Sequence, residues 1–144
     1  MTLLPAQSAS AVTNRRSDIE VKNRTSETIT DVVVLHRYST DEPTRNKVDE
    51  IGKREDANLR SAAKYRTGFG RTGKSWWKLT WKNGDGQSCF TNPNNGQGGE
   101  FRGYKRHNLT SKDDDEVVTI SIKNSNVVTI YSPSGTSTTA YNCF

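Results

Sequence analysis

The chain has 144 residues, of which 31% are hydrophobic, and its formal net charge is +5 at neutral pH. This length fits one domain, and the low hydrophobic content disfavours a large helical globule. No apolar stretch approaches the length of a membrane span, which excludes a transmembrane helix from the predicted fold.

Most predicted elements are short strands separated by turns. Residues 1–17 are small, polar and aperiodic, and they predict a flexible N-terminal tail. The remainder, 18–144, is predicted to be a single β domain. A short alternating strand is expected at 19–22. The stronger segment 29–38 has four consecutive apolar residues at its centre, which indicates a central strand covered on both faces.

The middle of the chain contains the clearest alternation. Trp77, Leu79 and Trp81 fall on one face of a strand predicted from Trp76 to Lys82. Asn-Gly and Asp-Gly pairs follow directly and predict a hairpin turn. About nine short strands with regular turns are typical of an antiparallel β-sandwich. The other expected segments are loops at 39–46 and 92–99, a weak segment at 47–53, strands at 59–66, 88–91, 101–107, 118–122, 128–130 and 136–144, and an acidic turn at 108–116.

The positive charge is concentrated in one part of the sequence. Residues 60–82 contain seven Lys or Arg and no acid, and Arg102, Lys105 and Arg106 form a second cluster. Outside these two clusters, 11 cations face 16 acids. Such asymmetry attracts nucleic acid or anionic membrane, although a solvated strand face gives the same composition. Aromatic residues between the cations of 60–82 make a nucleic-acid-binding module the first alternative function.

Residues 68–75 read Gly-Phe-Gly-Arg-Thr-Gly-Lys-Ser and match the P-loop pattern of nucleotide-binding proteins. A working P-loop needs a buried strand before the glycines and a helix after them. Here a polar segment precedes the motif and a tryptophan-rich strand follows it. We therefore interpret the motif as a structural turn and keep nucleotide binding as a further alternative. The residues assigned to this turn are Gly68, Arg71, Thr72 and Gly73.

The sequence contains no pattern for an active site or a metal centre. His36 and His107 lie far apart and have no ligand at zinc spacing, and the acidic run 113–116 lacks the spacing of a calcium loop. There is no nucleophile elbow. We therefore expect no catalytic residue, no metal and no cofactor, and we expect His36 to be a hydrogen-bonded core histidine.

The two cysteines and the N-terminus indicate a compartment. The first residues have no basic segment and no long apolar run, so a cytoplasmic protein is expected, or one released without a signal peptide. Cys89 and Cys143 are then expected to be free thiols, with a disulfide left open for an oxidising compartment. The glycosylation sequons at Asn23 and Asn108 are interpreted as chance.

Three motifs in order carry a resemblance to a known family. They are His36-Arg37-Tyr38-Ser39, then Thr67-Gly68-x-x-Arg71-Thr72-Gly73-Lys74-x-Trp76-Trp77, then Asn108-Leu109-Thr110-Ser111-Lys112-Asp113-Asp114. With them, the region 18–144 resembles the up-regulated-in-Daf (PUD) domain family, described from nematodes and also present in fungi.

The resemblance implies a β-sandwich similar to the fungal aegerolysins, formation of homo- or heterodimers, and no catalytic residues. Aegerolysins recognise membrane lipids. The leading hypothesis is therefore a non-enzymatic binding module that recognises a lipid or membrane surface. Its predicted contact residues are Trp76, Lys78 and Tyr104.

Overall fold

Alternating buried and exposed side chains define ten strands in the computed structural model, which describes residues 12–68, 73–93 and 101–144. The predicted all-β fold class is confirmed, and one short 3-10 helix, η3, spans Ser111–Asp113. No helix in these ranges is long and apolar enough to cross a membrane. The strands are β1 (Thr13–Arg24), β2 (Ile29–Tyr38), β3 (Thr44–Ile51), β4 (Asp56–Thr67), β5 (Ser75–Lys82), β6 (Ser88–Thr91), β7 (Lys105–Arg106), β8 (Val117–Lys123), β9 (Val127–Ser132) and β10 (Gly135–Cys143).

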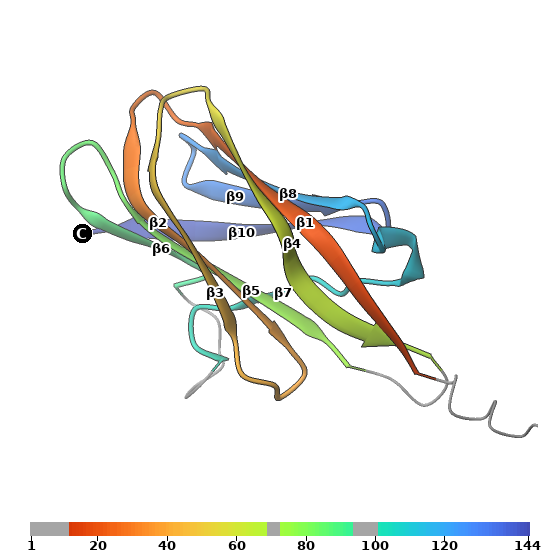
Figure 1. Cartoon of the computed structure of the whole chain (residues 1–144). Helices are drawn as coiled ribbons and strands as arrows, with labels where there is room; N and C mark the ends of the chain where they lie inside the picture. Colours follow the sequence, from red (N-terminus) through yellow and green to blue (C-terminus); the bar gives the residue numbers. More distant parts are fainter. Residues whose placement is uncertain (1–11, 69–72, 94–100) are drawn as a thin grey trace, which may run out of the picture.

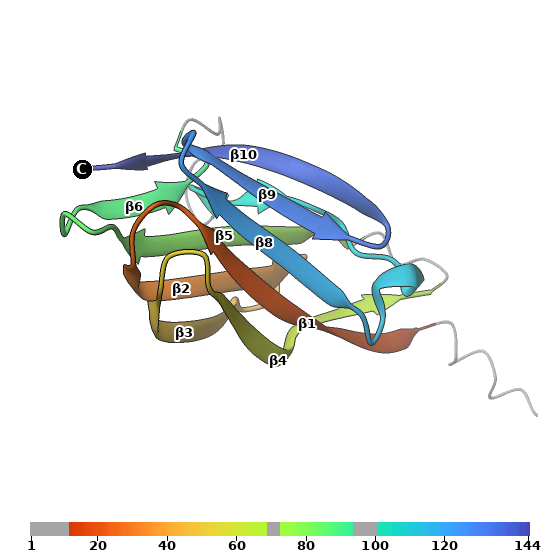
Figure 2. The same ribbon diagram turned by 90° about the horizontal axis from the view of Figure 1, so that it is seen from above.

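All described strands belong to one sheet, with the order β3-β2-β5-β6-β10-β9-β8-β1-β4 and with β7 added to β5. The sheet curls until its two end strands, β3 and β4, come close together, so the fold is a nearly closed barrel (Figures 1 and 2). β10 pairs with both β9 and β6, and so joins the strands β3-β2-β5-β6 to the strands β9-β8-β1-β4. The predicted two-sheet sandwich therefore needs correcting to one continuous sheet, and the likeness to aegerolysins stays a prediction.

One strand pair also departs from the predicted antiparallel arrangement. β1 runs parallel to β8 over Asp18–Arg24 and Val117–Lys123, while its other neighbour, β4, is antiparallel to it. A parallel pair needs a long crossover connection, and the chain between β1 and β8, which contains β2 to β7, supplies one. The alternation of apolar and polar residues in the sequence does not distinguish a parallel strand pair from an antiparallel one.

The interior of the barrel contains the side chains that the alternation predicted. Trp77, Leu79 and Trp81 point inward from β5, and Val32 and Val34 of β2 are fully buried. The inward aromatic and aliphatic side chains of the described strands form one continuous cluster. Burial of this apolar surface is the main stabilising contribution to the fold.

β4 contains a bulge in its pairing with β1. The β1–β4 register runs from Ser17 opposite Ala63 to Ile19 opposite Leu59, so β4 contains extra residues. Ser61 takes a φ of 50° there, and its N–H donates to Asp18 Oδ1 at 2.7 Å. The bulge turns two consecutive alanines, Ala62 and Ala63, into the core. The predicted strand at 59–66 is confirmed and extends to Asp56–Thr67.

The N-terminal boundary predicted at residue 17 is wrong in part. β1 begins at Thr13, and Ser17 is 1% exposed, with its hydroxyl donating to the carbonyl of Asp113 at 2.6 Å. Polar residues at 13–17 are strand because their partners come from elsewhere in the chain, which local composition does not reveal. Residues 1–11 lie outside the described residues. Two other boundaries differ: β3 begins at Thr44, and the strand expected at 101–107 is only Lys105–Arg106.

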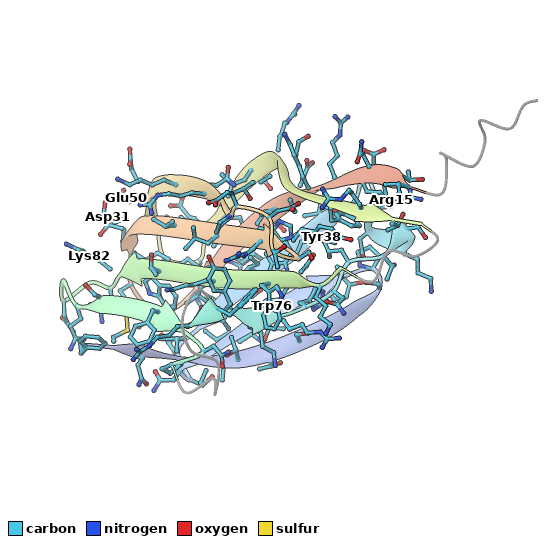
Figure 3. All side chains as sticks on the ribbon, turned by 90° about the horizontal axis from the view of Figure 1, so that it is seen from below. Arg15, Asp31, Tyr38, Glu50, Trp76 and Lys82 are labelled. Carbon is cyan, nitrogen blue, oxygen red and sulfur yellow. A yellow bond between two sulfur atoms is a disulfide. The ribbon has the colours of Figure 1, made fainter. Side chains whose placement is uncertain are left out.

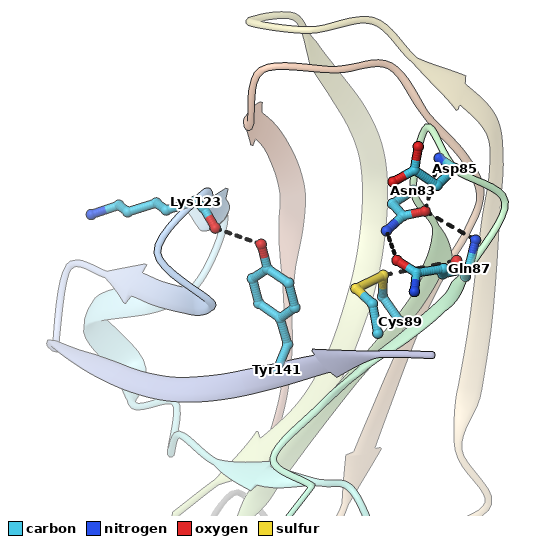
Figure 4. The surroundings of a disulfide bond; sticks show 7 residues. Asn83, Asp85, Gln87, Cys89, Lys123 and Tyr141 are labelled. Atoms are coloured by element: carbon cyan, nitrogen blue, oxygen red, sulfur yellow. Dashed lines mark hydrogen bonds between the residues drawn. A yellow bond between two sulfur atoms is a disulfide. The ribbon is translucent and has the colours of Figure 1, made fainter.

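The expectation of two free thiols is also wrong, because Cys89 and Cys143 form a disulfide across 54 residues (Figure 4). The two cysteines lie opposite each other in the β6–β10 ladder. Their neighbours Ser88 and Phe144 exchange both backbone hydrogen bonds, so the cysteines occupy the next, non-hydrogen-bonded position, where side chains are closest. The predicted hairpin turn before β6 is confirmed: Asn83 Oδ1 accepts hydrogen bonds from the N–H groups of Asp85 and Gln87 (Figure 4).

Candidate functional site

The structure brings the three predicted contact residues together on the outside of the barrel. Trp76 and Lys78 point outward from β5 because the alternate residues fill the core. Figure 3 labels Trp76 on this strand. The segment 101–104 crosses this outer face and adds Phe101 and Tyr104. The Phe101 ring packs on Trp76 at 4.8 Å between centroids, and Lys78 Nζ lies 5.8 Å from the Tyr104 centroid.

A glycine and an arginine hold this aromatic layer against the strand. Gly103 has a φ of 84°, and an added Cβ would lie 2.9 Å from Lys78 Cε. The lack of a side chain thus lets the segment approach β5 closely. On the other side, the Arg37 guanidinium lies 4.7 Å from the centroid of Phe101, a cation–π distance.

The aromatic rings are not an exposed surface, which corrects part of the sequence prediction. Tyr104 is 6% exposed, and Trp76 is half-buried under Phe101. Burial raises the pKa of Tyr104, and the nearby charge of Arg37 opposes that effect. The rings therefore form a layer on the outer side of β5, and cationic side chains lie next to this layer.

These cations, which we call the basic face, are Lys74, Lys78, Lys82, Arg102 and Arg106. Residues 73–82 and 101–106 contain no acid. Within the described ranges, none of the five forms an ion pair. The positive charge is concentrated away from the Lys82 end, because Asp31 and Glu50 lie near Lys82 (Figure 3). The basic face is therefore available to an external anion.

A small groove of about 300 Å³ opens beside the aromatic layer. Its lining combines one exposed cation, two hydroxyl side chains and two aromatic rings. Such a combination suits a phosphate or carboxylate group better than an apolar ligand, because it offers charge and hydrogen-bond donors at one place. The lining residues are Ser39, Thr40, Gly73, Lys74, Trp76 and Phe101.

A strand follows the P-loop pattern in the described part of the chain. Ser75 begins β5 and is 1% exposed, with Oγ 3.1 Å from His36 Nε2. A strand therefore follows the motif where a nucleotide site needs a helix. Gly68 takes a φ of 132°, and a Cβ on Gly73 would overlap the Tyr38 ring, so each position favours glycine. The other two assigned turn residues, Arg71 and Thr72, lie outside the described residues.

A larger cavity of about 670 Å³, which sequence analysis missed, opens between β3 and β4. We call it the seam cavity, because it lies in the unpaired seam between the two end strands. The residues gather there from four strands and two loops, and charge patterning within any one segment does not reveal them. The lining residues are Asn14, Arg15, Arg16, His36, Tyr38, Asp41, Glu42, Thr44, Lys64, Tyr65, Arg66, Asp114 and Asp115.

The two histidines are both buried and hydrogen-bonded, as expected for His36. Desolvation lowers the pKa of His36 to about 3, so the ring is neutral at physiological pH. His107 lies between the hydroxyls of Ser132 and Ser137, at 2.8 and 2.7 Å, and burial lowers its pKa as well. Among the described residues, no group of three or more His, Cys, Asp and Glu is placed to hold a metal ion.

Comparisons with known proteins were made for sequence and for fold. A search of curated protein sequences found no match. A solved structure described as the NMR structure of a protein from Eubacterium rectale aligns with a TM-score of 0.45 and 17% identity, over 84% of this chain and 91% of the other. A family model described as up-regulated in long-lived daf-2 matches residues 13–100 and 96–141. The chain therefore belongs to this family, and the PUD resemblance is confirmed.

Proposed function

We propose that the protein is a non-enzymatic binding module that docks its basic face on an anionic lipid surface. The observation that carries the proposal is the set of five cations without an ion pair in the described part of the chain. Each Lys or Arg near an anionic membrane contributes about 1 kcal/mol of binding free energy. Several such side chains on one face can contact the same membrane at once, so their contributions to the binding free energy add up. The same cations scattered over the surface could not all contact it.

The groove beside Lys74 supports a head-group contact within this surface. A lipid phosphate or carboxylate placed in the groove would lie beside the Lys74 ammonium and the hydroxyls of Ser39 and Thr40. Lys74 is exposed and needs no displacement of an existing ion pair. The geometry thus favours an anionic head group over a zwitterionic one at this place.

Single-stranded nucleic acid, the first alternative, requires aromatic faces on which bases stack. Trp76 and Tyr104 are covered by Phe101 and by Lys78, so they offer no open ring for stacking. The same cations attract any polyanion, however, and nucleic acid is therefore an arm of the test.

The disulfide favours one of the two expected locations. Disulfides persist in oxidising compartments and are rare in the cytosol. The Cys89–Cys143 bond therefore supports a protein that is released from the cell over a cytoplasmic one. Thiol titration of protein purified from its natural source without reductant would test this point, and two free thiols would contradict it. Dimer formation stays a prediction from the family resemblance.

The test is co-sedimentation with vesicles of phosphatidylcholine alone and with added phosphatidylserine. We expect binding only with phosphatidylserine, and the double variant Lys74→Gln/Arg102→Gln should bind at least tenfold more weakly, since each charge contributes about 1 kcal/mol. The matched control is Lys53→Gln/Lys123→Gln, which removes two exposed cations outside the basic face. No binding to anionic vesicles, or equal loss in the control, would overturn the proposal. Tighter binding to a single-stranded oligonucleotide would replace it with the nucleic-acid alternative.

A further inference from the structure

The seam cavity lies where two strand edges face each other without a hydrogen-bonded ladder. β3 and β4 are the ends of the sheet path, and one side chain of β3 and one of β2 reach backbone carbonyls of β4. Thr44 Oγ1 lies 3.1 Å from the carbonyl oxygen of His36 and 3.4 Å from that of Ala62, so its one hydrogen is shared between them. Tyr38 Oη donates to the carbonyl of Arg66 at 2.9 Å. The cavity opens around these contacts at the end of the barrel that carries Arg15 and Tyr38 (Figure 3).

One residue between these two carbonyls of β4 has backbone groups available for pairing. Backbone groups alternate in direction along a strand, and the carbonyls of Ala62 and Arg66 both face the seam. The N–H and C=O of Lys64 therefore face the seam too. In the described ranges β4 pairs only with β1, on its other edge, so these two groups have no ladder partner. An extended peptide could use both, as in strand addition to a sheet edge.

The charges that line the cavity are balanced, with four cations and four acids. Six of them form three ion pairs: Arg15–Asp114 at 3.0 Å, Arg16–Asp115 at 3.6 Å and Arg66–Asp41 at 2.8 Å. The remaining two are one cation, Lys64 of β4, and one acid, Glu42 of the β2–β3 loop. Neither forms an ion pair within the described part of the chain. A ligand with one negative and one positive charge could therefore form ion pairs with both of these side chains.

The inner wall of the cavity adds a polar ring, that of His36. His36 lines the cavity and is 2% exposed, and its Nε2 is 3.1 Å from Ser75 Oγ. The other ring nitrogen, Nδ1, makes no hydrogen bond to any described residue. The low pKa of His36 keeps the ring neutral, so it does not disturb the charge balance.

We infer that the seam cavity binds a short extended peptide with free ends. Its carboxylate pairs with the Lys64 ammonium, its amino group pairs with the Glu42 carboxylate, and its backbone pairs with Lys64 at the free edge of β4. His36 Nδ1 provides a hydrogen-bonding position on the inner wall. The cavity volume of about 670 Å³ lies in the usual range for small ligands. This site is separate from the basic face and does not depend on lipid binding.

Two defined peptides test the inference by NMR titration of the full chain. The probes are trialanine and Ala-Tyr-Ala, each with free ends, N-acetylated, or C-amidated. We expect the free peptides to bind and each blocked form to bind at least tenfold more weakly, because one terminal charge is then lost. The shifted resonances should include the Lys64 amide and the His36 ring.

Two variants assign the ends of the peptide. Lys64→Gln should bind the free peptide no better than the wild type binds the C-amidated one, while Glu42→Gln should match the loss caused by N-acetylation. Both positions are exposed, so folding is expected to survive, and Lys53→Gln is the control that should bind normally. Absence of binding by both free peptides at millimolar concentration overturns the inference. Equal binding of free and blocked peptides, or unchanged binding by Lys64→Gln, overturns it as well.

Discussion

The seam cavity and the basic face both carry many charged side chains, but they hold them in opposite ways. In the seam cavity, six of eight charges are neutralised by a neighbour within 4 Å. On the basic face, five cations stand without an ion-pair partner in the described ranges. The fields of paired opposite charges largely cancel, so such pairs act mainly on their immediate neighbours. Unpaired charges of one sign attract an opposite charge over about a Debye length.

The two regions also differ in what lies beneath their charges. Tyr65 and His36, at the inner wall of the seam cavity, belong to the buried interior and are each 2% exposed. The aromatic layer under the basic face lies outside the sheet, on the outer side of β5. Changes at the cavity wall should therefore affect folding first, and changes at the basic face should affect binding first.

Truncating one aromatic side chain in each region should separate these effects most strongly. Tyr65→Ala removes a buried ring and its hydrogen bond to the carbonyl of Thr110, and should cost about 3–5 kcal/mol of unfolding free energy. Trp76→Ala removes a half-buried ring and should cost only about 1–2 kcal/mol. Urea unfolding followed by tryptophan fluorescence or circular dichroism measures both. Equal losses would mean that the outer layer is as much part of the core as the cavity wall.

Acid should lower the stability of the fold through His36 at the cavity wall. Burial lowers the pKa of His36 from 6.5 to about 3, so the unfolded chain takes up a proton below pH 6.5 that the folded chain refuses. Stability is therefore full above this range and falls with pH, by about 2 kcal/mol for His36 between about pH 7 and about pH 5. His107, whose pKa is also lowered, adds to the slope.

The variant His36→Gln isolates this contribution to the pH dependence. It keeps a polar group near Ser75 but cannot titrate, so its unfolding free energy should fall by about 2 kcal/mol less than that of the wild type over the same range. Urea unfolding at each pH gives both slopes. Parallel slopes for the two proteins would show that His36 is not held neutral.

Glycine substitutions should show how the aromatic layer is held on β5. Gly103 and Gly86 both have positive φ, at 84° and 79°, so alanine at either position costs about 1–2 kcal/mol of backbone strain. A Cβ at Gly86 meets nothing within 4 Å, whereas one at Gly103 meets Lys78 Cε at 2.9 Å. Thermal unfolding should show similar losses, and only Gly103→Ala should also weaken vesicle binding. Weakening by Gly86→Ala would contradict a local role for the segment 101–104.

Sequence reasoning found the basic face because its evidence is local. The alternation from Trp76 to Lys82 sets which side chains point outward, and the absence of acids is visible in the composition. The burial of Tyr104 was missed, since it depends on a crossing segment that regular alternation does not predict. The strand after the P-loop pattern was predicted correctly, because the alternation from Trp76 to Lys82 is that of a strand and not of a helix.

The seam cavity was not predicted, because its parts come together only in the folded chain. Arg15 belonged to an expected tail, and its partner Asp114 is 99 residues away. The bulge at Ser61 shifts the register of β4 and so decides which residues reach the seam. The disulfide was not predicted for the same reason, since the pairing of β6 with β10 brings together cysteines that are 54 residues apart in the sequence.

The smallest predicted effect concerns the ion pairs of the seam cavity. Arg15 Nη1 donates to Asp114 Oδ2 at 3.0 Å, and the two side chains are 22% and 27% exposed. The backbone N–H of Arg16 also donates to Asp114, which is the largest cause of the lowered pKa of that carboxyl. A double-mutant cycle with Arg15→Gln and Asp114→Asn should give a coupling free energy of about 0.2–1 kcal/mol, because Asn keeps the oxygen that accepts from Arg16.

Salt distinguishes this pair from the basic face. Between about 0.1 M and about 1 M salt, the coupling should fall by a few tenths of a kcal/mol, because the charges are already in contact. Vesicle binding by the unpaired cations should fall over the same range by orders of magnitude, since it depends on attraction over longer distances. Equal changes of the coupling free energy and the binding free energy with salt would contradict the distinction between the paired charges of the seam cavity and the unpaired cations of the basic face. A coupling well above the expected range would instead place the Arg15–Asp114 pair among buried ion pairs, whose removal disturbs the fold itself.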